Sequence, residues 1–221
     1  MSGAYESFVD STDTPIRGFF HHPTNPNGKG LVLTHGAGAN CRSSLLLAIS
    51  EHFANSGFTV LRCDLPFRQV RPFGPPHPAQ AQRDREGLKR ALEALRKQVS
   101  GRVFLGGHSY GGRQASMLCA SEPDLVDGLL LLSCPLHPPR KPEQLRTQHF
   151  PELRTKSLFV HGTRDPLGLI DEMSLALKLI PAETSLLQRE GAGHDLGFKG
   201  KAQDPQLAPV VLQRFHEFFD V

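Results

Sequence analysis

The sequence predicts an α/β fold in which helices cover both faces of a mostly parallel central sheet. Two observations predict it. Short apolar runs alternate along the chain with segments that have helical spacing. The runs are also apolar almost throughout, which is the pattern of strands that helices bury on both faces. The length of 221 residues, 38% of them hydrophobic, fits a single domain over residues 1–221.

The first half of the chain supplies three predicted strands and two predicted helices. The strands are Ile16–His21, Gly30–Thr34 and Phe58–Cys63. A helix is predicted over Ser43–Ala54, because its apolar residues have helical spacing and Gly57 suits its end. A second helix is predicted over residues 79–99, where apolar side chains recur at three- and four-residue steps. The segment Pro66–Pro78 between them is rich in proline and is predicted to be a loop.

The second half continues the alternation of strands and helices. The predicted strands are Val103–Gly106, Val126–Ser133, Leu158–His161 and Ser185–Gln188. The predicted helices are Tyr110–Cys119, residues 168–179 and Val210–Phe219. Ligands bind such sheets at the carboxyl ends of the strands, so the segments that directly follow the strands are the place to look for a site.

A glycine-rich turn joins the strand that ends near Gly106 to the helix that begins near Tyr110. It reads Gly107-His108-Ser109-Tyr110-Gly111. In this strand–turn–helix setting a serine can act as a nucleophile, because small glycines on either side let the chain turn sharply and expose the hydroxyl. The positive end of the helix beside Ser109 favours a developing oxyanion. The alternative is a glycine-rich turn that only connects two elements.

An acid and a histidine follow two later strands. Asp165 lies shortly after Leu158–His161, and His194 lies shortly after Ser185–Gln188. The acid can orient the histidine and stabilise its charged form, and the histidine can then act as a base. Each has a structural alternative: Asp165 can cap a helix that starts after Pro166, and a lone loop histidine is usually just exposed. Asp195 is a competing acid, but a direct sequence neighbour would reach the histidine ring only with difficulty.

The chain order Ser109, Asp165, His194 is the order found in α/β-hydrolases, and each residue follows a different predicted strand. A further glycine-rich turn, His35-Gly36-Ala37-Gly38, follows an early strand, where a second oxyanion donor is expected. We therefore predict that the backbone N–H groups of Ala37 and Tyr110 form an oxyanion hole. The predicted chemistry is attack of Ser109 on an acyl carbon, with His194 as base and then acid, followed by hydrolysis of the acyl-enzyme.

Several segments resemble those of one group of compact hydrolases. They are Leu33-Thr34-His35-Gly36-Ala37, Val103-Phe104-Leu105-Gly106-Gly107, Cys134-Pro135-Leu136-His137-Pro138-Pro139, Leu158-Phe159-Val160-His161-Gly162 and Gly193-His194. On these segments the chain resembles the dienelactone-hydrolase-like branch of the α/β-hydrolase superfamily, and within it the KANL/Tex group. The resemblance implies an α/β-hydrolase fold and supports Ser109, Asp165 and His194 as the triad positions. It implies no substrate, and dienelactone hydrolase itself uses a cysteine where this chain has Ser109.

Only about two dozen residues separate Ser133 from the next predicted strand. That is too few for the large helical lid of many α/β-hydrolases. We therefore predict no lid domain, an open and shallow site, and a substrate of modest size. His137 in this connection, and Arg68 and Arg71 in the proline-rich loop, are candidate substrate contacts, with the arginines able to bind an anionic group. For each of the three, a packed or solvated loop residue is the alternative.

Composition narrows the partners and the compartment. The formal net charge of +3 is spread along the chain without a basic stripe, so we expect no nucleic-acid partner. The first residues lack the features of a signal peptide, and no apolar run is long enough to span a bilayer. The four cysteines fit neither a zinc site nor a disulfide scaffold. We expect a cytoplasmic monomer or homodimer that acts on a small acyl substrate without a metal or other cofactor.

The predicted function is therefore that of a serine hydrolase that cleaves a small carboxylic ester or thioester. Two alternatives stay open. One is a protein-interaction module that keeps the fold with little activity, since fold does not fix function. The other is a small acylpeptide or dipeptide hydrolase, which the predicted lack of a lid or accessory domain weakens.

Overall fold

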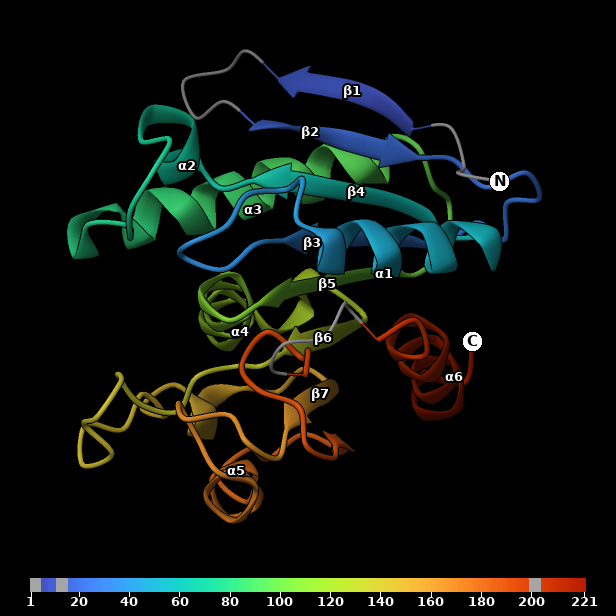
Figure 1. Ribbon diagram of the computed structural model, residues 1–221. Helices are drawn as coiled ribbons and strands as arrows, with labels where there is room; N and C mark the ends of the chain where they lie inside the picture. The colour runs from blue at the N-terminus through green and yellow to red at the C-terminus, as the bar shows by residue number, and fades with distance from the viewer. Residues whose placement is uncertain (1–4, 11–15, 199–203) are drawn as a thin grey trace.

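The computed structural model describes residues 5–10, 16–198 and 204–221, and eight of its strands form one sheet (Figure 1). The strands are β1 Tyr5–Asp10, β2 Ile16–His21, β3 Gly30–Thr34, β4 Thr59–Asp64, β5 Val103–His108, β6 Gly128–Leu132, β7 Ser157–Gly162 and β8 Thr184–Arg189. Their order across the sheet is β1-β2-β4-β3-β5-β6-β7-β8. β2 is antiparallel to both its neighbours, and every other pair of neighbours is parallel. The predicted mostly parallel sheet is confirmed.

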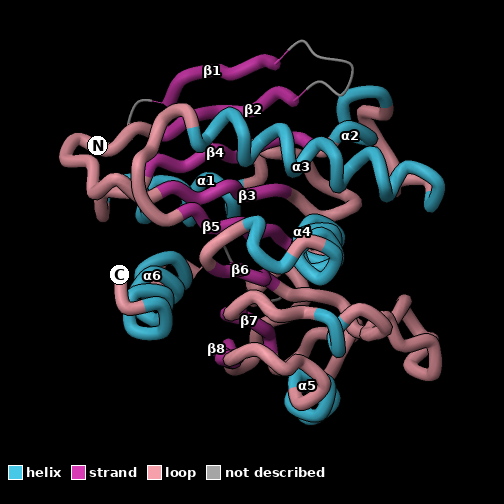
Figure 2. The backbone as a smooth tube through the Cα atoms, turned by 180° about the vertical axis from the view of Figure 1, so that it is seen from behind, coloured by secondary structure: helices cyan, strands magenta, loops and turns pink. Residues whose placement is uncertain are grey.

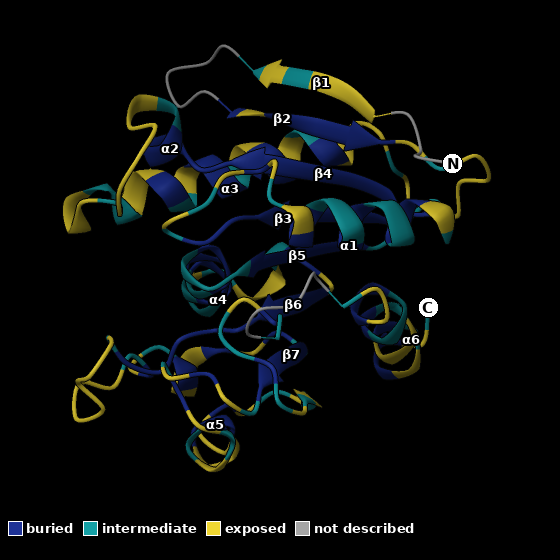
Figure 3. Ribbon diagram, viewed as in Figure 1, coloured by how far each residue is buried: buried dark blue, intermediate teal, exposed yellow. Residues whose placement is uncertain are grey.

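Six α-helices lie within the described part of the chain. They are α1 Ser44–Asn55, α2 Pro66–Val70, α3 Ala81–Arg96, α4 Tyr110–Ser121, α5 Ile170–Leu177 and α6 Leu207–Phe219. α1 and α6 cover one face of the sheet, and α3, α4 and α5 cover the other (Figures 1 and 2). Both faces of the central strands are therefore closed to water, and β3, β4, β6 and β7 are buried from end to end (Figure 3). None of these helices is long and apolar enough to cross a membrane.

Phenylalanine rings fill the core between the sheet and the pair α1–α6. The ring of Phe215 on α6 lies 4.9 Å from that of Phe53 on α1 and 4.8 Å from that of Phe104 on β5, measured between ring centroids. Each such ring contributes about 1.5–3 kcal/mol when it leaves water. The start of α1 is fixed by Ser43, whose Oγ accepts the N–H of Leu46 at 3.4 Å. These contacts hold α1, and the loop that precedes it, firmly against the sheet.

The opposite face is packed by the helix that the sequence predicted over residues 79–99. The side chains of Leu88, Ala91, Leu92 and Leu95 on α3 are all fully buried. They are four of the five residues whose three- and four-residue spacing predicted the helix, and the fifth, Val99, lies beyond its end. The helix itself is shorter, Ala81–Arg96, and it is preceded by a 3-10 turn at Pro78–Gln80.

One strand and one α-helix of the structure were not predicted. β1 was not predicted, because it is an edge strand that lies against β2 alone and has no apolar run, with Tyr5 43% and Val9 70% exposed. α2 lies in the segment predicted to be a loop. Its first residue, Pro66, has a backbone angle suited to the first turn of a helix, and the buried ring of Phe67 anchors it.

The connection from β6 to β7 carries no helical lid. In this fully described segment, residues 133–156, the only helical element is the 3-10 turn Phe150–Glu152. The predicted absence of a lid domain is confirmed. The carboxyl ends of the parallel strands are therefore bordered by loops, and the candidate residues lie there.

Candidate active site

Ser109 occupies a strained position between β5 and α4. Its backbone angles are φ 50° and ψ −113°, a conformation that a residue with a side chain rarely adopts. Two backbone hydrogen bonds hold it there. The N–H of Ser109 donates to Leu132 O at the end of β6 (2.8 Å), and Ser109 O accepts the N–H of Arg113 in α4 (2.9 Å). The neighbouring strand and the following helix together fix the direction of the Ser109 side chain.

The two glycines that flank this turn are required by close backbone contact. A Cβ at Gly107 would lie 2.7 Å from the backbone of both Gly111 and Gly112. A Cβ at Gly111 would lie 2.6 Å from the carbonyl oxygen of His35. Real Cβ atoms do not approach backbone so closely, so only glycine fits at either position. The glycines therefore let the serine turn pack against the loop that follows β3.

Ser109, His194 and Asp165 form a continuous chain of hydrogen bonds. Nε2 of His194 lies 2.8 Å from Oγ of Ser109, and Nδ1 of His194 lies 2.8 Å from Oδ2 of Asp165. A carboxylate can only accept, so Nδ1 carries the proton and Nε2 is left to accept the hydroxyl of Ser109. Asp165 is fully buried, whereas the His194 side chain is 27% exposed. The three residues follow β5, β7 and β8, as the sequence predicted.

The hydrogen bonds of Asp165 and Asp195 decide between the alternatives for the acid, which were a helix cap at Asp165 and a competing acid at Asp195. α5 begins at Ile170, so Asp165 caps no helix; instead its Oδ1 accepts the N–H of Leu167 at 2.9 Å and stabilises the turn after β7. Asp195 is exposed, and its Oδ1 accepts the N–H of Gly197 at 3.0 Å within its own loop. Asp165 is thus the acid that meets the histidine ring, and Asp195 is not.

Two further histidines support this arrangement and were not assigned by the sequence analysis. Nε2 of His108 donates to the backbone carbonyl of His194 at 2.9 Å. Burial lowers the pKa of His108 to about 4, so its ring is neutral near pH 7. Nε2 of His161 donates to Gly168 O at 2.7 Å and lies 3.6 Å from Oδ2 of Asp165. Burial also lowers the pKa of His161. His108 directly precedes Ser109 in the sequence, and this position was the signal from which a role near the nucleophile could have been predicted.

The loop after β3 brings Ala37 to the serine. Nδ1 of His35 donates to Gly36 O (2.8 Å), and Nε2 of His35 accepts the N–H of Leu65 (3.1 Å), so this buried ring fixes the start of the loop. The backbone N–H groups of Ala37 and Tyr110 have no hydrogen-bond acceptor in the described parts of the chain. Both residues line the same cavity as Ser109. Two free donors therefore border the space next to the serine.

The structure places Arg68, a candidate substrate contact, outside the cavity wall. Arg68 is buried, and its guanidinium is bound by backbone carbonyls. Nε donates to Ala39 O at 2.8 Å, Nη1 donates to Arg71 O at 2.9 Å, and Nη2 donates to Ala37 O and to Gly74 O. Four of its five N–H donors are thus occupied by backbone carbonyls, and Arg68 is not among the residues that line the cavity. Its place is behind the loop that carries Ala37, which it ties to the proline-rich segment.

Arg71 and His137 also lie outside the cavity wall. Arg71 is exposed, and its Nη1 donates to Pro75 O at 3.4 Å. His137 is buried, with Nδ1 donating to Pro138 O at 2.9 Å and Nε2 lying 3.7 Å from a carboxylate oxygen of Glu172. His137 is thus a packed loop residue, which was the alternative considered for it, and neither side chain is among the residues that line the cavity.

A cavity of about 860 Å³ opens at Ser109 and His194. Prolines from two loops build much of its wall, Pro75, Pro76 and Pro78 on one side and Pro135 and Pro139 on the other. No helical lid covers it, as predicted, and loops at the carboxyl ends of the strands border it. Its volume lies toward the upper end of small-molecule sites. The side chains Arg113, Gln114 and Arg146 also line it, and the sequence analysis named none of them.

The Tyr110 side chain points to a structural role that is separate from its backbone N–H. Its hydroxyl donates to Oδ2 of Asp84 at 2.7 Å, and Oδ1 of Asp84 accepts the N–H of Phe67 at 2.9 Å. Asp84 is fully buried, and burial raises its pKa. This carboxyl group joins α3, α2 and the first residue of α4, so it fixes the wall of the cavity on the side of α2.

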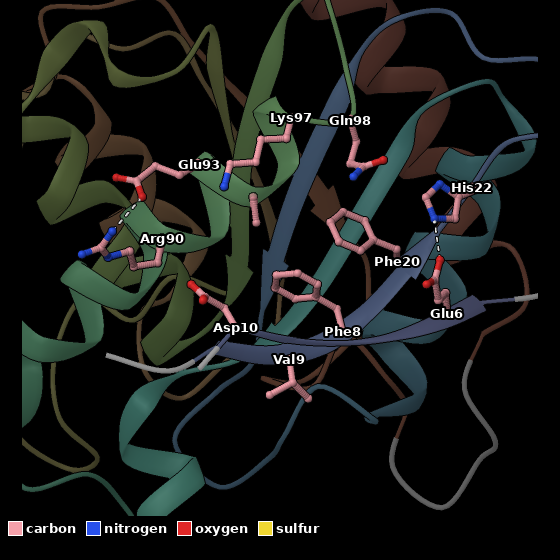
Figure 4. A pocket seen from close by; sticks show the side chains of 11 residues that line it. Glu6, Phe8, Val9, Asp10, Phe20, His22, Arg90, Glu93, Lys97 and Gln98 are labelled. Atoms are coloured by element: carbon pink, nitrogen blue, oxygen red, sulfur yellow. Dashed lines mark hydrogen bonds and ion pairs between the residues drawn. The ribbon is translucent and has the colours of Figure 1, made fainter. Parts of the chain in front are cut away.

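A second hollow, of about 340 Å³, lies between β1, β2 and α3 (Figure 4). The rings of Phe8 and Phe20 meet at its floor, 5.1 Å apart, and the ion pairs Arg90–Glu93 and His22–Glu6 lie at its rim. Its lining includes no serine or cysteine. It thus lacks the serine that lies beside a histidine and an acid in the cavity at Ser109, which is the candidate active site.

The structure offers little for a metal ion. Within the described residues, no group of three His, Cys, Asp or Glu side chains is arranged to hold one. The four cysteines are buried free thiols. The chemistry of the cavity is therefore considered through its serine, histidine and carboxylate groups.

Comparisons with known proteins agree with this architecture. A sequence model of the family described as "Alpha/beta hydrolase domain" matches residues 27–216, which is most of the chain. The chain is similar in structure to dienelactone hydrolase from Anabaena variabilis, with a TM-score of 0.76 and 19% identity, covering 100% of this chain and 98% of that one. It is also similar to Est1E from Butyrivibrio proteoclasticus, with a TM-score of 0.75 and 16% identity over 97% and 99% of the two chains.

A third similar structure is an alpha-beta serine hydrolase homologue from Coxiella burnetii. Its TM-score is 0.74 at 14% identity, over 95% of this chain and 96% of that one. At these identities the three structures share a fold with this chain. The near-complete coverage of both chains means that the shared fold extends over nearly all of each aligned chain.

Proposed function

The chain belongs to the α/β-hydrolase domain family, and on that premise we propose that it is a serine hydrolase that cleaves a carboxylic ester or thioester. The family match supports a hydrolytic enzyme. The proposal adds which residues carry out the hydrolysis and which type of bond is cleaved. Ser109 is the nucleophile, His194 the general base and acid, and Asp165 the acid that orients His194.

One observation carries the proposal: the unbroken hydrogen-bond chain from Ser109 Oγ through His194 to Asp165, with both links at 2.8 Å. A structural role would not require a serine in a strained backbone conformation, aimed at a histidine whose tautomer is set by a buried acid. The three groups come from three separate loops, and their convergence beside one cavity supports a shared task.

The proposed reaction follows from these contacts. Nε2 of His194 takes the hydroxyl proton of Ser109 as its Oγ attacks the acyl carbon, and Asp165 stabilises the imidazolium that forms. The N–H groups of Ala37 and Tyr110 bind the oxyanion, helped by the N-terminus of α4. His194 then protonates the leaving alcohol or thiol. Water, deprotonated by His194, attacks the acyl-enzyme, and the collapse of the second intermediate releases the acid and restores Ser109.

Two features support an acyl substrate of modest size, and the relatives are consistent with one. The first is the size of the cavity that the proline-rich loops border, about 860 Å³, which is enough for a small-molecule ester. The second is the lack of a helical lid in the segment between β6 and β7, without which a long enclosed acyl tunnel is not formed. Among the similar structures, Est1E has also been solved with ferulic acid bound, at a TM-score of 0.77 and 16% identity. Ferulic acid is a ligand of Est1E. For this chain it only suggests that aromatic acyl esters should be tested first.

A fluorophosphonate probe tests the proposal directly, because it forms a covalent adduct only with an activated serine. We expect labelling of the wild type, with the adduct located by mass spectrometry on the peptide that contains Ser109. Ser109→Ala is expected to abolish labelling. Ser100→Ala is the matched control, because Ser100 is exposed and remote from the histidine, and it is expected to label like the wild type.

Three other outcomes would decide against the proposal in defined ways. A folded wild type that does not label would favour an interaction module that keeps the fold without turnover. Labelling with cleavage of peptide p-nitroanilides but not of p-nitrophenyl esters would favour a peptidase. A preference for long acyl chains over acetyl and butyryl esters would contradict the modest substrate size.

A further inference from the structure

The charged side chains of the active-site cavity are all of one sign. Of the residues that line it, only Arg113 and Arg146 carry a full charge, and no aspartate or glutamate is among them. Arg113 lies on α4 one helical turn beyond Ser109, with its N–H bonded to Ser109 O at 2.9 Å. Both residues line the same cavity, so the Arg113 side chain lies on the same side of α4 as the serine. Arg146 comes from the loop between β6 and β7.

These two guanidinium groups have no acidic partner. Within the described chain, neither has a carboxylate at ion-pair distance, although both line a cavity, whereas five other arginines are paired. The paired ones are Arg17, Arg90, Arg102, Arg189 and Arg214. The titratable groups that face Arg113 are Arg146, Cys134, Tyr110, Arg85 and His149, none of which is a carboxylic acid. Burial, followed by the charge of Arg146, lowers the pKa of Arg113.

Polar atoms in the same wall are also left unsatisfied. Nε of Arg113 and Nε2 of Gln114 are buried and make no hydrogen bond. Gln114 is fully buried, and its Oε1 accepts from Nη1 of Arg85 at 3.0 Å, so its amide is held with the donor end unpaired. Buried donors without an acceptor are costly and rare in folded proteins. An acceptor supplied from outside the chain would remove both this cost and the repulsion between the two arginines.

We propose that Arg113 and Arg146 form an anion-binding subsite, and that the substrate hydrolysed at Ser109 carries a second group with anionic oxygens, a carboxylate or a phosphate. The proposal deepens the function proposed above and rests on it for the reaction, but not for binding. Planar guanidinium groups bind such anions through paired N–H donors. The subsite lies about one helical turn from the nucleophile, roughly 6 Å along α4. The anionic group and the scissile carbonyl would therefore occupy the same cavity.

Matched esters test the preference for charge. The 4-nitrophenyl monoester of glutaric acid has a carboxylate at its acyl end, and 4-nitrophenyl butyrate has the same leaving group without the charge. 4-Acetoxybenzoate and 4-acetoxyphenyl phosphate place a carboxylate or a phosphate on the leaving group, with phenyl acetate as their neutral counterpart. We expect the wild type to favour at least one anionic ester over its neutral counterpart by about tenfold or more in kcat/KM. The arm that shows the preference identifies the group and its side.

Variants locate the effect. Arg113→Gln and Arg146→Gln are each expected to remove most of the charge preference, and Arg113→Lys to retain part of it. Arg154→Gln is the matched control, because Arg154 is exposed and outside the cavity, and it is expected to keep the full preference. Because the two arginines lie on different elements, either variant decides the matter if the other fails to fold. A wild type without preference in every arm, or a preference that both variants keep, overturns the subsite.

A binding measurement separates this proposal from the catalytic one. Calorimetric titration of glutarate and of inorganic phosphate into Ser109→Ala is expected to show binding of one of them, weakened about tenfold or more when Arg146→Gln is added. If the esters are not turned over and the probe does not label, the proposed function fails while this titration still decides the subsite. If labelling succeeds and neither anion binds to Ser109→Ala, the subsite fails while the hydrolase remains.

Discussion

Oδ2 of Asp165 lies 2.8 Å from Nδ1 of His194, while Oδ1 of the same carboxylate is held at 2.9 Å by the backbone N–H of Leu167. Both oxygens are thus fixed on a side chain with no exposed surface. His194 is restrained in turn at its backbone carbonyl by Nε2 of His108. The direction of the imidazole is therefore determined by contacts on two sides, and the carboxylate determines which nitrogen carries the proton.

Replacing this carboxylate by an amide should invert the tautomer of His194. In Asp165→Asn an amide N–H₂ can face Nδ1, which favours the ring with its proton on Nε2, and that ring cannot accept the proton of Ser109. We expect kcat for 4-nitrophenyl acetate to fall by about three to four orders of magnitude, the size known for this change in serine proteases. Asp195→Asn is the control, with an expected change below about twofold. Asp165→Asn with a tenth or more of wild-type activity would contradict the assignment of Asp165.

Arg68 should influence turnover through the loop that it supports. Its guanidinium binds Ala37 O and Ala39 O, so Arg68→Gln is expected to loosen the loop that offers the Ala37 N–H. Loss of one oxyanion donor lowers kcat by about 10²–10³-fold in serine hydrolysis. We expect a fall in kcat of about tenfold to a hundredfold for a neutral ester, with KM changed much less. Arg71→Gln, which alters an exposed arginine nearby, should behave like the wild type. A rise in KM at constant kcat would instead indicate a substrate contact.

The parts of the fold that could be predicted from the sequence are those determined by the local pattern of apolar and turn residues. Ile16–His21 and Gly30–Thr34 were predicted with their observed bounds, because an apolar strand between turn residues has few alternatives. β1 was missed because its pairing with β2 is determined by the tertiary fold and not by its own residues. The convergence of Ser109, Asp165 and His194 was predictable because the carboxyl ends of parallel strands meet at one edge of the sheet.

The functions of the arginines could not be predicted from the sequence in the same way. An arginine in a loop can be solvated, bound to carbonyls or free to bind substrate, and which of these holds depends on groups distant in sequence. Arg68 meets Ala37 O across 31 positions of the chain. Arg146 reaches the cavity from a loop without regular structure. The spacing of four between Ser109 and Arg113 was the one local signal that could have placed a cation beside the nucleophile.

Gly111 should tolerate no side chain. Its missing Cβ would lie 2.6 Å from His35 O, so Gly111→Ala must displace either α4 or the loop after β3. Overpacking of this kind costs about 1–3 kcal/mol, and here it also moves Ser109 relative to Ala37. We expect that loss in the free energy of unfolding by urea, together with slower fluorophosphonate labelling. Gly38→Ala is the control in the same loop region, because no atom lies within 4 Å of its Cβ position. Equal stability of the two variants would contradict this account.

The hydroxyl of Tyr110 should matter for stability and much less for catalysis. Tyr110→Phe leaves the buried Oδ2 of Asp84 without its donor but keeps the backbone N–H at position 110. A buried polar group that loses its partner costs about 1–3 kcal/mol, and more if charged. We expect that loss of unfolding free energy with kcat within a few fold of the wild type. The double variant Asp84→Asn/Tyr110→Phe should lose less than the sum of the single variants, because the two groups interact directly. Additive losses would show that they do not.

Because of His21, the free energy of unfolding should decrease as the pH falls into the mildly acidic range. Its ring is buried, and Nε2 accepts Nε–H of Arg62 at 2.7 Å, which requires the neutral ring. Burial, and next the charge of Arg62, lowers the pKa of His21 from 6.5 to about 4. Between these two values the unfolded chain binds a proton that the folded chain does not. The stability contribution is therefore intact above pH 6.5 and is lost as the pH falls toward 4.

The expected loss from His21 alone is at most about 3 kcal/mol over that range, because one pKa unit corresponds to about 1.4 kcal/mol. Urea unfolding at pH 7.0, 6.0 and 5.0 measures it. In His21→Gln the free energy of unfolding should be lower at pH 7.0, since the bond to Arg62 is altered, but it should fall less steeply with acidity than in the wild type. His77→Gln, which replaces an exposed histidine at the cavity rim, should keep the wild-type slope. If His21→Gln keeps that slope as well, the acid sensitivity arises elsewhere, with the buried rings of His108 and His161 as the next groups to replace, since burial lowers the pKa of both.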